Sequence, residues 1–88
     1  LVQESVSNAL KHGRADDIWV KVEWLRDIMN IIIKDNGHGF DQNEVKDKSF
    51  GLIGMRERID LLKGNMTISS TIGNGTTIHF QIPLEVNK

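Results

Sequence analysis

The sequence predicts a two-layer α/β sandwich, with a mixed but mostly antiparallel sheet that carries helices on one face. Two segments with helical periodicity are each followed by a pair of strand-like segments, in the order α-β-β-loop-α-β-β. Strands that directly follow one another favour hairpins and argue against a doubly wound parallel sheet. The length of 88 residues allows one small domain, so we expect residues 1–88 to form a single unit.

Residues 1–12 predict an amphipathic helix that ends at Gly13. Its apolar face consists of Val2, Val6, Ala9 and Leu10. Its polar face consists of Glu4, Asn8 and Lys11. No capping residue precedes Leu1, so we expect this helix to begin upstream and the chain to be truncated at its N-terminus.

Residues 18–25 and 28–34 predict two strands of an antiparallel hairpin, joined by a tight turn at Arg26-Asp27. The first strand alternates, with Ile18, Val20, Val22 and Trp24 on one side. The second contains the run Ile31-Ile32-Ile33, which indicates burial on both faces.

Residues 35–50 show no periodicity, and residues 52–63 then predict a second helix that ends at Gly64. Its apolar stripe consists of Leu52, Met55, Ile59 and Leu62. Residues 66–71 and 76–82 predict two further strands around the turn Gly73-Asn74-Gly75, and Pro83 marks the end of the last strand.

Composition excludes several classes of function. The chain has no cysteine, so it has no disulfide framework and no thiolate metal site. Lys+Arg 11 against Asp+Glu 12 gives no basic field for binding nucleic acid. No apolar run is long enough to span a membrane. The three histidines share no metal-ligand spacing, and we expect the tryptophans and phenylalanines to pack rather than to stack on bases.

The first candidate site is the polar helix face with Glu4, Asn8 and Lys11, and with His12 at its edge. A carboxylate, an amide oxygen and an ammonium in line suit a hard cation and the phosphates around it. The alternative is the ordinary polar face of a surface helix.

The second candidate is Asp35-Asn36-Gly37-His38-Gly39-Phe40, directly after the isoleucine-rich strand. An aspartate fixed at the end of a buried strand can accept a hydrogen bond from the exocyclic amine of a base, and glycines let the backbone approach a ligand. The segment does not fit a calcium loop, a dinucleotide fingerprint or a Walker loop. The alternative is a plain glycine-rich turn.

Two further glycine segments complete the set. Gly51-Leu52-Ile53-Gly54-Met55-Arg56-Glu57-Arg58 begins a helix whose free N–H groups suit a phosphate, with Arg56 or Arg58 adding charge. Gly73-Asn74-Gly75-Thr76 is an ordinary hairpin turn or places Thr76 at a base edge. For the first of these, the alternative is a loop hinge followed by surface arginines.

In this order and spacing, the four segments resemble the motifs of the ATP-binding domain of bacterial sensor histidine kinases. That domain has the Bergerat fold, shared with gyrase, heat-shock chaperones and mismatch-repair ATPases. Gln3-Glu4-x-x-x-Asn8-x-x-Lys11-His12 resembles the N-box, and the other three segments resemble the glycine boxes. Gly-Leu-x-Gly-Met-x-Glu-Arg and the short lid, Asp41 to Phe50, are similar to the subgroup of nitrate, lipid-fluidity and degradative-enzyme sensor kinases.

The resemblance implies a role for each matched position. Asn8 would coordinate Mg²⁺, and Glu4 beside it would act in catalysis by orienting a water or the metal shell. Lys11 and His12 would contact phosphates. Asp35 would bind the adenine amine, and Thr76 would support it. The residues expected to line the base, ribose and phosphates are Gly37, Gly39, Gly51, Leu52, Gly54 and Met55.

The resemblance also implies a reaction and its partners. The domain would bind Mg-ATP and pass the γ-phosphoryl group to a histidine on a separate dimerisation domain, and from there to a response regulator. The whole protein would be a homodimer, and this domain would be cytoplasmic without direct contact to a membrane or to nucleic acid. The first strand of the family domain, the start of its first helix and the phosphoaccepting histidine have no counterpart in the chain. The alternatives are an ATPase or serine kinase of the same superfamily, or a non-catalytic nucleotide-binding module.

Overall fold

A computed structural model describes residues 1–11, 14–39 and 52–84 of the chain. The two helices in this part are α1 (Val2–Lys11) and α2 (Leu52–Leu61). Its strands are β1 (Ile18–Leu25), β2 (Ile28–Asp35), β3 (Asn65–Ser70) and β4 (Thr76–Pro83). Each predicted helix and strand is present, with boundaries that differ by one or two residues.

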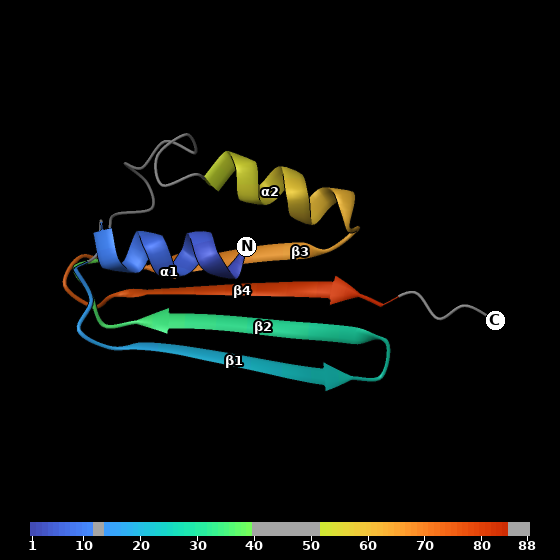
Figure 1. Ribbon diagram of the computed structural model, residues 1–88, viewed down its shortest axis with the longest axis horizontal. Coiled ribbons are helices and arrows are strands. Elements are labelled where there is room, and N and C mark those ends of the chain that lie inside the picture. Colours follow the sequence, from blue (N-terminus) through green and yellow to red (C-terminus); the bar gives the residue numbers. More distant parts are fainter. Residues whose placement is uncertain (12–13, 40–51, 85–88) are drawn as a thin grey trace.

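The four strands form an antiparallel sheet in the order β1-β2-β4-β3 (Figure 1). The helices lie on one side of this sheet, where α1 packs against β2 and α2 packs against β3. The architecture is therefore the predicted two-layer α/β sandwich, and in the described part every strand pairing is antiparallel.

The hydrophobic core lies between the helices and the two central strands. Its most deeply buried side chains are Phe80, Ile33, Met55 and Ile59. Ile31 and Ile33 face this core, but Ile32 on the other side of β2 is only half-buried. The prediction of burial on both faces is therefore wrong for this strand, because nothing in the described chain covers the sheet's second face.

The buried face of α1 differs only in part from the predicted one, because Ala9 is buried and Val2 packs against the core as expected. Ser5 and Ala9 are its buried residues, whereas Leu10 is 56% exposed. Small side chains at these two positions allow the helix to lie close to the sheet. The hydroxyl of Ser5 is satisfied because it donates to the carbonyl of Leu1 at 2.8 Å.

Helix α2 ends in a Schellman motif. The N–H of Gly64 donates to the carbonyl of Ile59 at 2.9 Å, and that of Lys63 donates to Asp60 at 3.0 Å. Lys63, with φ of 58°, occupies the left-handed position that usually belongs to glycine. Leu62 lies beyond the helix and is 48% exposed, so it does not extend the apolar stripe.

Strand β1 lies at an edge of the sheet and is poorly covered. Its helix-facing side chains Val20, Val22 and Trp24 are exposed because the helices lie over the other strands. Trp19 on the opposite face is also exposed, so neither tryptophan belongs to the hydrophobic core. Among the residues that the structure describes, no helix is long and apolar enough to cross a membrane.

Candidate functional site

Asp35 ends the central strand β2 and is 7% exposed. One oxygen of its carboxylate, Oδ1, accepts a hydrogen bond from the N–H of Gly37 at 2.8 Å. The described residues place no cation against this carboxylate. A buried carboxylate that is fixed by one backbone donor can take a further donor from a ligand.

The next residue, Asn36, anchors the segment and does not face a ligand. Its side-chain oxygen accepts hydrogen bonds from the N–H groups of Asp16 and Asp17 at 3.0 and 2.9 Å. Its amide nitrogen donates to the carboxylate of Asp17 at 3.3 Å. Asn36 therefore ties the end of β2 to the residues that precede β1.

The first and last glycine segments pack backbone against backbone. The N–H of Gly73 donates to the carbonyl of His38 at 2.6 Å. Gly39 and Gly75 have φ of 65° and 80°, in the left-handed region. A Cβ at Gly75 would overlap the carbonyl oxygen of Asp35, and one at Gly39 would overlap that of Thr71. The two segments thus form one surface at the end of the sheet.

Thr76 is the register partner of Asp35 across the two central strands. The buried hydroxyl of Ser70 donates to the carbonyl of Gly75 at 3.1 Å and lies 2.8 Å from the hydroxyl of Thr76. Because Ser70 has one proton and gives it to a carbonyl, the Thr76 hydroxyl donates to Ser70. The sequence reasoning missed Ser70, which is identified only by this cross-strand contact.

The polar face of α1 is split between the two ends of the helix. Lys11 is exposed in the last turn, and this end of α1 lies on the same side of the molecule as Asp35 (Figure 1). Asn8 is half-buried one turn earlier. Glu4, one further turn back, forms an ion pair with Arg58 of α2. His12 lies outside the described residues.

The second glycine segment contributes two core side chains. Leu52 and Met55 are 5% and 0% exposed and pack against the core, so only their backbone groups can serve a ligand. A Cβ placed on Gly54 would meet no described atom outside its own stretch of helix within 4 Å. The first turn of α2 contains no acidic residue, which suits an anion at its N–H groups. Gly51 lies outside the described residues.

A divalent metal fits this donor set only together with a bound phosphate. Among residues 1–11, 14–39 and 52–84, no group of three or more His, Cys, Asp or Glu could hold a metal ion. Mg²⁺ in phosphate sites takes one or two protein oxygens and completes its shell with water and phosphate oxygens. Asn8 and Glu4 lie four residues apart on one helix and could supply such oxygens.

Comparison with known proteins supports one family. Residues 1–86 match the family described as histidine kinase-, DNA gyrase B-, and HSP90-like ATPase. The chain is 56% identical over 89 residues to the signal transduction histidine-protein kinase/phosphatase DegS of Bacillus subtilis, covering 98% of this chain and 23% of that protein. It is 48% identical to the Brevibacillus brevis DegS, covering 96% of this chain and 22% of that protein.

Solved structures share the same fold. The ATP binding domain of PrrB from Mycobacterium tuberculosis superposes with a TM-score of 0.82 at 25% identity, covering 97% of this chain and 65% of that chain. The Erythrobacter litoralis EL346 blue-light activated histidine kinase gives a TM-score of 0.79 at 21% identity, covering 94% of this chain and 28% of that chain. The chain spans less than a quarter of the length of the two DegS relatives.

Proposed function

The chain belongs to the family of histidine kinase-, DNA gyrase B- and HSP90-like ATPases, and from this membership we propose that it is the ATP-binding part of a sensor histidine kinase. It binds Mg-ATP and donates the γ-phosphoryl group to a histidine on a separate dimerisation domain. The two relatives reported above are named histidine-protein kinase/phosphatase, which favours a histidine acceptor over a serine acceptor. The whole protein would then act as a homodimer that passes the phosphoryl group on to a response regulator.

The proposal rests mainly on the buried carboxylate of Asp35, which lies where the first and last glycine segments pack against each other. Its Oδ1 is fixed by Gly37, and the backbone around it comes close only because Gly39 and Gly75 have no Cβ. A carboxylate accepts hydrogen bonds and cannot donate them when ionised. It therefore selects a base with an exocyclic amine, as in adenine, over a base with a carbonyl at the same position.

The remaining residues act on the phosphates. The N–H groups at the start of α2 and the ammonium of Lys11 contact the phosphate chain, while Asn8 supplies an oxygen ligand for the metal. A bound Mg²⁺ neutralises the negative charge that develops on the transferred group. The protein contributes mainly by positioning the nucleotide, since phosphoryl transfer needs little covalent work from its side chains.

Titration calorimetry of the 88-residue chain with a non-hydrolysable ATP analogue tests nucleotide binding. Asp35→Asn keeps the shape and the bond from Gly37 but adds an amide donor. We expect the affinity to fall about 10-fold or more, since a hydrogen bond to a charged group contributes about 1.5–3 kcal/mol. Asn8→Ala should weaken binding only in the presence of Mg²⁺.

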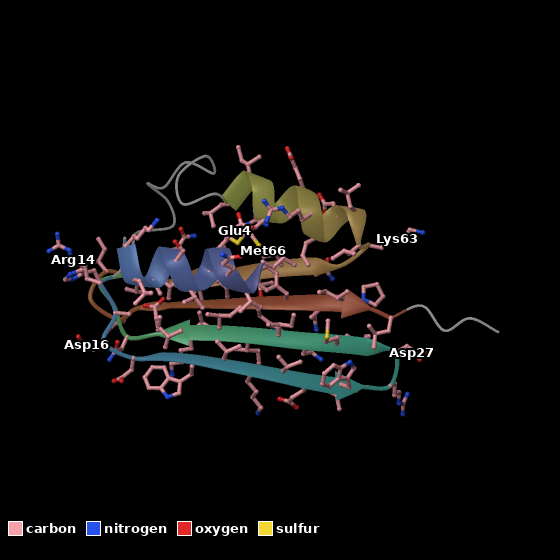
Figure 2. All side chains as sticks on the ribbon, in the orientation of Figure 1. Glu4, Arg14, Asp16, Asp27, Lys63 and Met66 are labelled. Carbon is pink, nitrogen blue, oxygen red and sulfur yellow. The ribbon has the colours of Figure 1, made fainter. Side chains whose placement is uncertain are left out.

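Asp27→Asn is the matched control, because Asp27 lies in the β1–β2 turn at the opposite end of the sheet (Figure 2). It should bind the analogue with unchanged affinity. Equal affinities for the Asp35→Asn variant and the unchanged chain would refute the nucleotide site.

A hybrid protein tests the transfer step. The 88 residues replace the matching segment of the Bacillus subtilis DegS, to which they are 56% identical. Incubation with labelled ATP should give a phosphate bond that is labile in acid and stable in base, as expected for phosphohistidine. A folded hybrid that forms only acid-stable phosphate, or only free phosphate, would contradict the proposed acceptor.

A further inference from the structure

Arg58 of α2 forms an ion pair with Glu4 of α1, and Figure 2 shows Glu4 between the two helices. Arg58 belongs to the last turn of its helix and Glu4 to the first turn of the other. The pair is half-exposed, with side-chain exposures of 55% for Arg58 and 33% for Glu4. It connects the helix that begins with the second glycine segment to the helix that carries Asn8.

A second contact between the same helices lies next to the pair. The buried hydroxyl of Ser5 lies 3.7 Å from the sulfur of Met55. Ser5 directly follows Glu4, and Met55 precedes Arg58 by one helical turn. The position of Glu4 relative to α2 is therefore set by a buried contact on one side and by Arg58 on the other.

The location of Arg58 does not suit a phosphate ligand. It lies six residues after Leu52, which corresponds to about 9 Å along the helix axis from the end where the N–H groups are free. Its guanidinium also contacts a carboxylate, which competes with any phosphate for the same donors. The ion pair indicates that Arg58 positions Glu4 and does not bind the nucleotide itself.

Glu4 in turn lies one helical turn before Asn8, on the same side of α1. The Oε1 atom of Glu4 is buried, and it is the atom that contacts Arg58. The amino group of Leu1 forms a second ion pair with the same oxygen at 3.8 Å. Arg58 is thus the side chain that pairs with this carboxylate across the two helices.

We propose that Arg58 is a positioning residue for phosphoryl transfer, which holds the Glu4 carboxylate in place beside Asn8. This inference rests on the proposed kinase function. The pair contributes little to folding, because half-exposed ion pairs add little to stability. Its effect therefore appears in the rate of transfer, which is sensitive to misplacement of a group near the reacting phosphate.

The test uses the hybrid kinase described above and measures kcat and KM for ATP in autophosphorylation. Arg58→Ala should lower kcat about 10-fold or more and leave KM nearly unchanged, because the nucleotide contacts are intact. Arg58→Lys should restore part of the rate, since it keeps the positive charge but not the planar guanidinium. In a Glu4→Gln background, Arg58→Ala should have no further effect.

Lys21→Ala is the matched control, because Lys21 pairs with Glu23 at 2.9 Å on β1, away from both helices. It should keep the parental kcat. An unchanged kcat for Arg58→Ala, a change in KM alone, or an equal loss in the Glu4→Gln background would each overturn the inference. A folded parental hybrid without any autophosphorylation would instead refute the proposed function, and the inference with it.

Discussion

At the scale of single residues, Gly75 is the point where the last glycine segment meets Asp35. Its φ of 80° and the overlap that a Cβ would have with the Asp35 carbonyl oxygen both exclude a side chain. Gly73, two residues earlier, has a similar φ of 84°, but beyond its chain neighbours no described atom lies within 4 Å of a Cβ placed there. The two glycines therefore separate the cost of backbone strain from the cost of a steric overlap.

We predict that Gly75→Ala lowers the free energy of unfolding by about 3 kcal/mol or more, because strain and overlap act together. Gly73→Ala should lower it by only about 1–2 kcal/mol, the cost of a left-handed non-glycine residue. Urea unfolding followed by circular dichroism measures both variants. Equal losses in the two variants would show that the packing of Gly75 against Asp35 adds nothing.

Only some residues of the candidate site could be predicted from the sequence. Asp35, Gly39, Gly75 and Thr76 could be selected from the sequence, and the structure brings them together at one end of the sheet. Ser70 could not be selected, because its partners are set by the register between β3 and β4. The ion pair of Arg58 was missed for a similar reason, since it depends on how two helices cross.

At the scale of elements, the end of α2 is held by a backbone pattern that normally uses glycine. Lys63 adopts φ of 58° there, and Gly64 follows directly before β3. A Cβ at Gly64 would overlap the carbonyl oxygen of Gln81. The neighbouring strand β4 thus requires glycine at residue 64. The left-handed backbone conformation is instead adopted by Lys63, a residue with a side chain.

We predict that Lys63→Gly raises the free energy of unfolding by about 1 kcal/mol, because glycine adopts the left-handed conformation without steric cost. Lys63→Ala keeps the strain and should change stability by less than about 0.5 kcal/mol. Thermal unfolding of the two variants provides the comparison. A stability gain in the alanine variant as large as that in the glycine variant would contradict this explanation.

The elements themselves were well predicted, because each follows from local periodicity and turn residues. Their burial was less well predicted. Leu10 of α1 and Trp24 of β1 are apolar but exposed, because no neighbouring element covers them in the described part of the chain. Ser5 is polar but buried next to Met55. Periodicity identifies the face of an element but not how much of that face a neighbour covers.

At the scale of the whole molecule, β1 leaves an apolar edge that faces solvent. Val22 and Trp24 are 43% and 64% exposed on the helix-facing side of this strand. The outer edge of β1 has no strand beside it in the described part of the chain. Edges of this kind promote pairing between molecules unless charges interrupt them, and the charged side chains of β1, Lys21 and Glu23, lie on its other face.

We predict that the isolated 88-residue chain self-associates as its concentration rises, and that Val22→Lys suppresses this association. The substitution should change the free energy of unfolding by less than about 1 kcal/mol, because Val22 is not in the core. Sedimentation velocity over a concentration series measures the association. A chain that stays monomeric throughout the series would show that the exposed edge is harmless.

The register between β2 and β4 has a further consequence for how the protein folds. Asp35 and Thr76 are distant in sequence and meet only when the two central strands pair. The candidate site and the core thus form in the same cooperative step, and a partly folded chain lacks the assembled site. A nucleotide that binds only the assembled site would stabilise it by about 2.7 kcal/mol at a free concentration 100 times its Kd. For a domain of this size, the bound nucleotide would then also stabilise the folded state substantially.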